Sequence, residues 1–360
     1  MIAMRRWSVL LTLAAASCVS APPVANNATP TVVASTRAPV SLIATPAPLE
    51  PTRTPITLWR DIEGVAASAR YLAWHGLKDG DPQRDSQQLM AMDRQTSRTI
   101  TIATAPRPAG LIAWLRVSDT WVVWADYTDR LQISDWRVRA ARLPDGAPIT
   151  LLEAPTNARL EDRPEFDLRG DEIVVAGRFA GASAHQVIRI GLVSGRREVL
   201  LEAKAPETLS WPAFGGDVVF VESRVAGSTR LLSVGRDGSP RSAPPPPASE
   251  PTFSGGWLAY KASERGDLGP IVFRSITTEE TLRSSDKGEA PASSDGVFTW
   301  VSAATPRVRV YDSLSHRSFG WDVPRELALS SAATAGRVVA VITQRLEAPT
   351  SFSIVLLEVP

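Results

Sequence analysis

A short apolar run that recurs along most of the chain constrains the fold more than any other feature of the sequence. The run often ends in an aromatic residue, and turn-forming clusters of Gly, Pro, Asp and Ser separate one copy from the next. No stretch keeps the 3.6-residue periodicity of an amphipathic helix. The copies begin, at spacings of 50, 52, 45, 39, 40 and 41 residues, at Tyr71, Trp121, Ile173, Val218, Trp257, Val297 and Val338.

An all-strand repeat of about 40 to 50 residues is the length of one propeller blade of about four strands. Seven copies therefore predict an all-β, seven-bladed β-propeller over residues 55–360, with six blades as the alternative. The last unit has its third strand at Phe352–Leu357 and no fourth strand after it. Pro55–Leu58 has the same four residues as the fourth-strand segment Pro148–Leu151. We therefore expect the N-terminal strand to supply the missing outer strand of the last blade, which would cover a bare sheet edge.

The start of each unit resembles a known propeller repeat. Pro251–Tyr260 and Pro291–Gly296 follow the outline Pro-x-x-Ser-Pro-Asp-Gly before an apolar strand, although no copy keeps the full Ser-Pro-Asp-Gly. This pattern is similar to TolB-type, WD-like propeller repeats. The resemblance implies the fold for most of residues 61–360 and no particular partner, since TolB has six blades and seven units are counted here.

The N-terminus has the pattern of an export signal. Arg5 and Arg6 precede a short apolar run, Trp7–Ala14, and the small residues after it lead to the only cysteine, Cys18. This arrangement resembles a bacterial lipobox, with Ala15 where leucine is usual. The resemblance implies lipidation at Cys18 and a membrane anchor on the extracytoplasmic face, in the periplasm or at the cell surface. A plain secretory signal is the alternative.

Residues 1–18 are thus interpreted as a lipoprotein signal peptide. Residues 19–54 are rich in Pro, Thr and Ala and predict a disordered tether between the membrane and the folded body.

Composition excludes several classes of function. The net charge is +1, from 39 basic and 38 acidic residues, so the chain has no long-range field to attract nucleic acid. A single cysteine rules out an internal disulfide framework and a cysteine-based zinc site. Nucleotide-binding and hydrolase motifs are absent. We expect no cofactor, no metal site and no catalytic residue that the sequence alone can name.

The most probable role by this reasoning is a binding or scaffolding module for a protein, peptide or glycan at the cell envelope. Function on such folds is carried by loops. The loop residues predicted to bind are Asp79, Arg84, Asp126, Tyr127, Arg178, Glu222, Arg224, Arg265 and Arg345.

Two other roles stay open. A glycan hydrolase or lyase would need paired carboxylates at a central pocket, and Asp79, Asp126, Glu222 and Asp267 are the candidates. A purely structural envelope protein would lack a pocket. Most tryptophans, Trp74, Trp124 and Trp300 among them, are expected to pack in the core, and His75 is expected at the rim of a loop.

Overall fold

The structure is a computed structural model that describes residues 40–43, 45–78, 86–105, 110–128, 134–302 and 306–360. These residues form antiparallel sheets with one short 3₁₀-helix, η1 (Leu160–Asp162). All seven recurring apolar runs are strands, and nearly every residue in them is buried. They lie inside the sheets with both faces covered. This burial explains why their residues are continuously apolar and do not alternate between apolar and polar.

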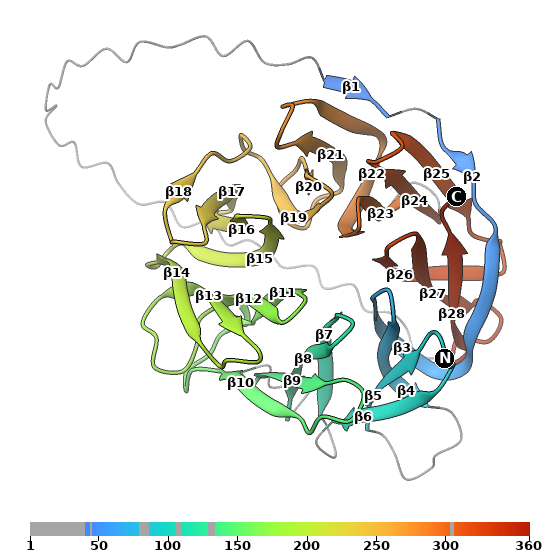
Figure 1. Ribbon diagram of the computed structural model, residues 1–360, viewed down its shortest axis with the longest axis horizontal. Coiled ribbons are helices and arrows are strands. Elements are labelled where there is room, and N and C mark those ends of the chain that lie inside the picture. The colour runs from blue at the N-terminus through green and yellow to red at the C-terminus, as the bar shows by residue number, and fades with distance from the viewer. Residues whose placement is uncertain (1–39, 44, 79–85, 106–109, 129–133, 303–305) are drawn as a thin grey trace, which may run out of the picture. The chain divides into compact units, whose positions relative to one another are not determined.

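Three sheets have four strands each, in chain order (Figure 1). Their strands are β7 (Leu111–Val117), β8 (Trp121–Tyr127), β9 (Arg137–Arg142) and β10 (Ile149–Glu153); β11 (Glu165–Arg169), β12 (Glu172–Gly177), β13 (His185–Gly191) and β14 (Arg197–Ala203); and β15 (Thr208–Gly215), β16 (Val218–Val225), β17 (Ser228–Gly235) and β18 (Pro240–Arg241).

A fourth, nine-stranded sheet holds a long strand with two roles. One half of β22 pairs with β21 and the other half with β23, so it is the last strand of one group and the first of the next. The strands of this sheet are β19 (Ser249–Ser254), β20 (Trp257–Lys261), β21 (Gly269–Ser275), β22 (Thr281–Ser294), β23 (Val297–Ser302), β24 (Arg307–Asp312), β25 (Arg317–Asp322), β1 (Val40–Leu42) and β2 (Ala47–Pro48).

The fifth sheet joins the two ends of the folded chain. β3 (Pro51–Ala67) pairs antiparallel with β28 through its first half and with β4 through its second half. The first half contains the segment predicted to pair with the last strand, and Ile56 lies opposite Ile354. The other strands are β4 (Tyr71–Lys78), β5 (Gln88–Asp93), β6 (Thr99–Thr104), β26 (Leu327–Ala335), β27 (Val338–Arg345) and β28 (Phe352–Glu358).

The segment just before β3 differs from the predicted tether. β1 pairs in parallel with β22 and β2 with β25, so residues 40–43 and 45–50 follow the outer strands of the nine-stranded sheet (Figure 1, blue). Leu49 is buried there against Phe319 and Trp321. Composition alone suggested disorder up to residue 54, but free sheet edges accept an extended chain that carries a few apolar residues. Residues 19–39 of the predicted tether lie outside the described residues.

The core is divided into clusters that lie between successive groups of strands. One joins Val123 and Trp136 to Ile173, and another joins Val174 to Phe214. Trp74, Trp124 and Trp300 are buried in such clusters, as predicted. The first strands of the groups also contact one another in sequence, from β3 to β7, β11, β15, β19, β22 and β26, and β26 contacts β3 again.

The matched segments around Ile56 and Ile149 allow a test of the pairing between β3 and β28. Ile56 is 8% exposed and Ile149 is 44% exposed. We expect Ile56→Ala to lower the free energy of unfolding by about 2–4 kcal/mol, because it opens a cavity in the core. Ile149→Ala should cost less than about 1 kcal/mol. Urea denaturation measures both free energies of unfolding. If the two variants lose the same amount, the pairing of β3 with β28 stabilises the protein no more than an ordinary edge strand does.

Candidate functional site

A cavity of about 840 Å³ lies among the first strands of the groups. Its lining comes from β3, β7, β11, β15, β19, β22, β23 and β26, the strands around the centre of Figure 1. Residues near the start of these first strands lie at the end where the loops after β16 and β20 also lie. The cavity therefore brings together side chains that are far apart in the sequence.

Bulges near the start of several first strands expose aromatic side chains to the cavity. Trp114 and Trp211 lie at register shifts of β7 and β15 and have positive φ angles of 50° and 46°. A left-handed backbone costs a residue with a side chain about 1 kcal/mol. Both indoles are half-buried, line the cavity, and meet edge to face with ring centroids 5.9 Å apart. The strained backbone thus presents an aromatic pair at the cavity wall.

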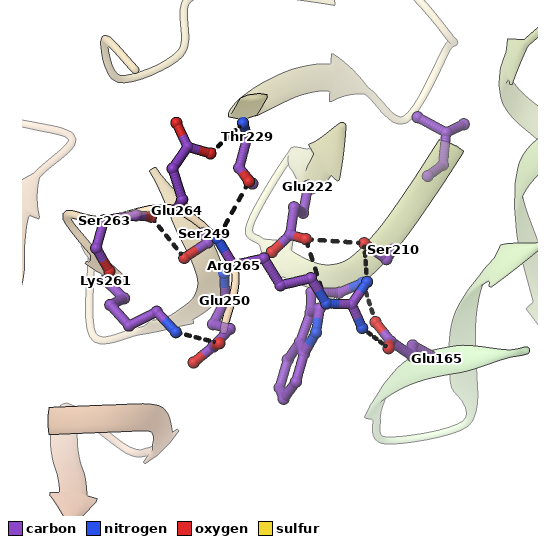
Figure 2. Close-up of polar contacts among 12 residues, drawn as sticks. Glu165, Ser210, Glu222, Thr229, Ser249, Glu250, Lys261, Ser263, Glu264 and Arg265 are labelled. Atoms are coloured by element: carbon purple, nitrogen blue, oxygen red, sulfur yellow. Dashed lines mark hydrogen bonds and ion pairs between the residues drawn. The ribbon is translucent and has the colours of Figure 1, made fainter. Parts of the chain in front are cut away.

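Arg265 links three sheets through Glu165, Ser210 and Glu222 (Figure 2). It lies in the loop after β20, and its Nη2 donates to Oε1 of Glu165 on β11 at 2.6 Å. Its Nη1 donates to Ser210 Oγ on β15 at 3.2 Å, and its Nε lies 3.7 Å from Oε1 of Glu222 on β16. One guanidinium therefore balances two buried carboxylates.

The two carboxylates also hold the bulged strands of their neighbours. Glu165 Oε2 accepts from the backbone N–H of Trp211 at 2.7 Å, and Glu222 Oε2 accepts from the N–H of Glu250 at 3.0 Å. A bulge leaves backbone donors without a partner in the ladder, and a buried donor needs an acceptor. The neighbouring side chains supply these acceptors.

Other side chains form the same kind of cross-sheet bond. Asp167 accepts from the N–H of Phe214, and Gln87 accepts from the N–H of Ile112. His185 accepts through Nδ1 from the N–H of Leu209, while its Nε2 meets Asp162 at 3.1 Å. Polar residues at these positions therefore hold neighbouring groups of strands in register.

Burial governs the acidity of these groups. It raises the pKa of Glu165, Glu222 and Asp167 above the ordinary carboxyl range. Arg265 opposes this rise at both glutamates, and Arg116 opposes it at Asp167. Next to the arginine network, Lys261 and Glu250 form a second buried ion pair (Figure 2).

His75, within β4, also lines the cavity. It was expected at a loop rim, but it is only 3% exposed. Its ring packs over Gly64 of β3, where an added Cβ would lie 2.4 Å from His75 Nε2. Burial lowers the pKa of His75 to about 4, so the ring is neutral at neutral pH.

The structure brings together only two of the residues predicted to bind, Glu222 and Arg265. Asp126 is buried in ion pairs with Arg137 and Arg139, and Tyr127 beside it is buried too. Asp126 and Tyr127 lie at the end of β8 and Glu222 lies within β16, and all three side chains are buried rather than exposed in the loops.

The remaining predicted binding residues are separate from one another. Arg178 pairs with Asp162. Arg224 and Arg345 are exposed. Asp79 and Arg84 lie outside the described residues.

Sequence reasoning did not select Glu165, Trp114 or Trp211 as site residues. Glu165 follows Pro164 at the start of a repeat unit, but its partner Arg265 is 100 residues away. Its strand alternates polar and apolar residues, which does not mark Glu165 as a site residue. Within the described ranges, no group of three His, Cys, Asp or Glu residues could hold a metal ion. No helix there is long and apolar enough to cross a membrane.

Comparison by sequence finds no matching protein family and no matching curated protein. Comparison of structures does find similar folds. The β-propeller domain of the Trilobed protease from Pyrococcus furiosus matches with a TM-score of 0.58 at 10% identity, covering 80% of this chain and 93% of that one. Oligogalacturonate lyase from Vibrio parahaemolyticus matches with a TM-score of 0.54 at 12% identity, covering 86% and 92%.

TolB from Acinetobacter baumannii is also similar, with a TM-score of 0.44 at 12% identity, covering 81% of this chain and 64% of TolB. The likenesses with the higher TM-scores, to the protease propeller domain and to the lyase, establish a β-propeller fold, as the repeats predicted. They include a protease domain and a lyase, so the fold does not distinguish a binding protein from an enzyme.

Replacing Arg265 tests its role as the shared counterion. Arg265→Ala leaves Glu165 and Glu222 buried without a cation, and we expect it to lower the free energy of unfolding by about 3 kcal/mol or more. Arg345→Ala, at the exposed last residue of β27, should change it by less than about 0.5 kcal/mol. Urea denaturation of both variants at neutral pH is the measurement, and equal midpoints would contradict the role.

The acidity of His75 predicts a pH dependence of stability. Between pH 6.5 and about 4 the unfolded chain binds a proton at this residue that the folded chain does not bind, so stability falls as the pH falls. The drop attributable to His75 amounts to about 3 kcal/mol. His75→Gln should remove that part of the slope, whereas His316→Gln should retain it. Denaturation curves from pH 4 to 7 with parallel slopes for all three proteins would contradict this assignment.

Proposed function

We propose that the protein is an envelope-anchored β-propeller that binds a protein, peptide or glycan ligand at its central cavity. The observation that carries the proposal is the aromatic pair, Trp114 and Trp211, which lines an 840 Å³ cavity on a strained backbone. Cavities of this size that combine aromatic and polar residues are typical ligand sites. A purely structural role would leave this arrangement without a use.

The proposal includes seven blades closed by the N-terminal strand. Counting each half of β3 and β22 separately assigns four strands to every recurring unit. The contacts from first strand to first strand, which return from β26 to β3, support this count. In this arrangement β26, β27 and β28 form the last blade together with the first half of β3.

An enzyme is the alternative, and the paired glutamates are its best support. Glu165 and Glu222 flank Arg265, and burial raises both pKa values, as a general acid requires. Glu222, however, is fully buried, and each carboxylate already accepts a backbone N–H. Groups held in this way are not free to exchange protons with a substrate, which favours binding over catalysis.

The anchor is the other part of the proposal. Cys18 would carry the lipid, with the protein on the extracytoplasmic face of a membrane. Because residues 40–43 and 45–50 follow the outer strands of the folded body, these residues would not be part of a free tether.

One experiment in intact cells tests both the location and the binding role. Wild type should incorporate labelled palmitate and partition with membranes, while Cys18→Ala should do neither. A membrane-impermeant crosslinker should give a discrete adduct with wild type. Trp114→Ala should lose this adduct, because the aromatic pair is gone.

The matched control is Leu346→Ala, which removes an exposed apolar side chain from the loop after β27, outside the cavity lining. This variant should keep the adduct. Export of wild type without palmitate would contradict the anchor. Failure of wild type to form any adduct would contradict the binding role.

A further inference from the structure

The cavity is acidic although the chain as a whole is nearly neutral. The described residues that line it include three glutamates and four aspartates, against two arginines and no lysine. Arg265 lies outside this lining and balances Glu165, and an excess of acidic residues is left. The net charge of the whole chain is +1, so the excess is local. A concave, low-dielectric wall of one charge sign concentrates ions of the opposite sign.

Acidic residues occur at both ends of the lining. Glu63 lies near the start of the half of β3 that pairs with β4, and Glu289 lies near the start of the half of β22 that pairs with β23. Asp119, Asp171 and Asp295 lie in the turns at the opposite end. From Trp114 to Asp119 the wall is about 16 Å long at 3.3 Å per residue. Charges spread over this length match a ligand that carries several cations in a row.

The aromatic pair adds a second, independent preference for cations. Trp114 and Trp211 are half-buried within the same lining, and Trp300 is a third tryptophan there. Indole faces attract ammonium and guanidinium groups, and tryptophan does so most strongly of the aromatic residues. A cation in this cavity would therefore meet carboxylates and aromatic rings together.

Three buried residues of the lining hold polar atoms that have no hydrogen-bond partner. These atoms are His75 Nδ1, Trp300 Nε1 and Thr334 Oγ1, and their residues are 3%, 3% and 5% exposed. Buried polar atoms normally have a partner, so such atoms beside a cavity indicate a place for ligand or water. Because His75 is neutral at neutral pH, it adds no positive charge to the wall.

We propose that the cavity binds a lysine-rich peptide segment in extended form, with its primary ammonium groups between the acidic ends and the tryptophans. This inference rests on the proposed binding role and names the ligand class for the same site. The proposed ligand differs in charge from an oligogalacturonate, the polyanion in the name of the lyase with a similar fold, because an acidic wall repels a polyanion.

Calorimetric titration of the purified full chain with hexalysine tests the proposal, with spermidine as a free polyamine and hexaglutamate as the opposite charge. We expect hexalysine to bind, more weakly as NaCl is added, and hexaglutamate not to bind. Glu289→Gln should weaken hexalysine binding about threefold, as expected for one partly solvated ion pair. Trp211→Ala should weaken it about fivefold through the lost cation–π contact.

Glu347→Gln is the matched control, since it removes an exposed carboxylate from the loop after β27, away from the cavity lining. It should leave hexalysine binding unchanged. Binding of spermidine as well would support ammonium recognition and show that a free polyamine satisfies it, whereas binding of hexalysine alone would support a peptide ligand.

Three results would overturn the inference: no heat with either cation, equal weakening by Glu347→Gln, or binding of hexaglutamate. If the palmitate and crosslinking results stand while hexalysine fails, only the ligand class is wrong. If hexalysine binds while those results fail, the cavity assignment holds and the anchored binding role does not.

Discussion

The antiparallel pairing of β3 with β28 is the constraint on which the rest of the structure depends. It joins residues about 300 positions apart, for example Ile56 and Ile354, and places both in one core cluster with Trp59 and Trp74. Without β3, β28 would be an exposed edge strand. The same strand continues into β4, so it fixes the first and last groups of strands to each other. The first strands around the cavity hold their places only if this junction holds.

Inside that frame, buried polar side chains connect neighbouring sheets where apolar contacts cannot. The bulges that turn Trp114 and Trp211 toward the cavity remove backbone donors from the ladders. Acceptors such as Glu165 and Gln87 reach across from the adjacent sheet to bind those donors. The arrangement stabilises only when it is complete, because an unpaired carboxylate in this position is strongly destabilising. Arg265 completes it for two carboxylates at once.

The fold could be predicted from the sequence because its signals are local and repeated. The apolar runs, the turns between them and the duplicated Pro-Ile-Thr-Leu segment all report strands that lie in register with their neighbours. Residues 40–50 were assigned to the tether because pairing along an outer edge needs little apolar content, and one buried side chain, Leu49, carries much of it. The ion pair between Glu165 and Arg265 could not be predicted, since its two halves become neighbours only after three sheets have packed.

The way the polar residues are held is the reason for proposing a binding role over an enzymatic one. Glu165, Glu222 and Asp167 are held by backbone N–H groups and arginines, so they supply fixed charge and geometry rather than mobile protons. Trp211 of the aromatic pair is held by the same bonds, because its backbone N–H donates to Glu165. A rigid wall of this kind loses little entropy when a ligand binds. The network that stabilises the fold thus also preorganises the cavity, and one set of residues serves both purposes.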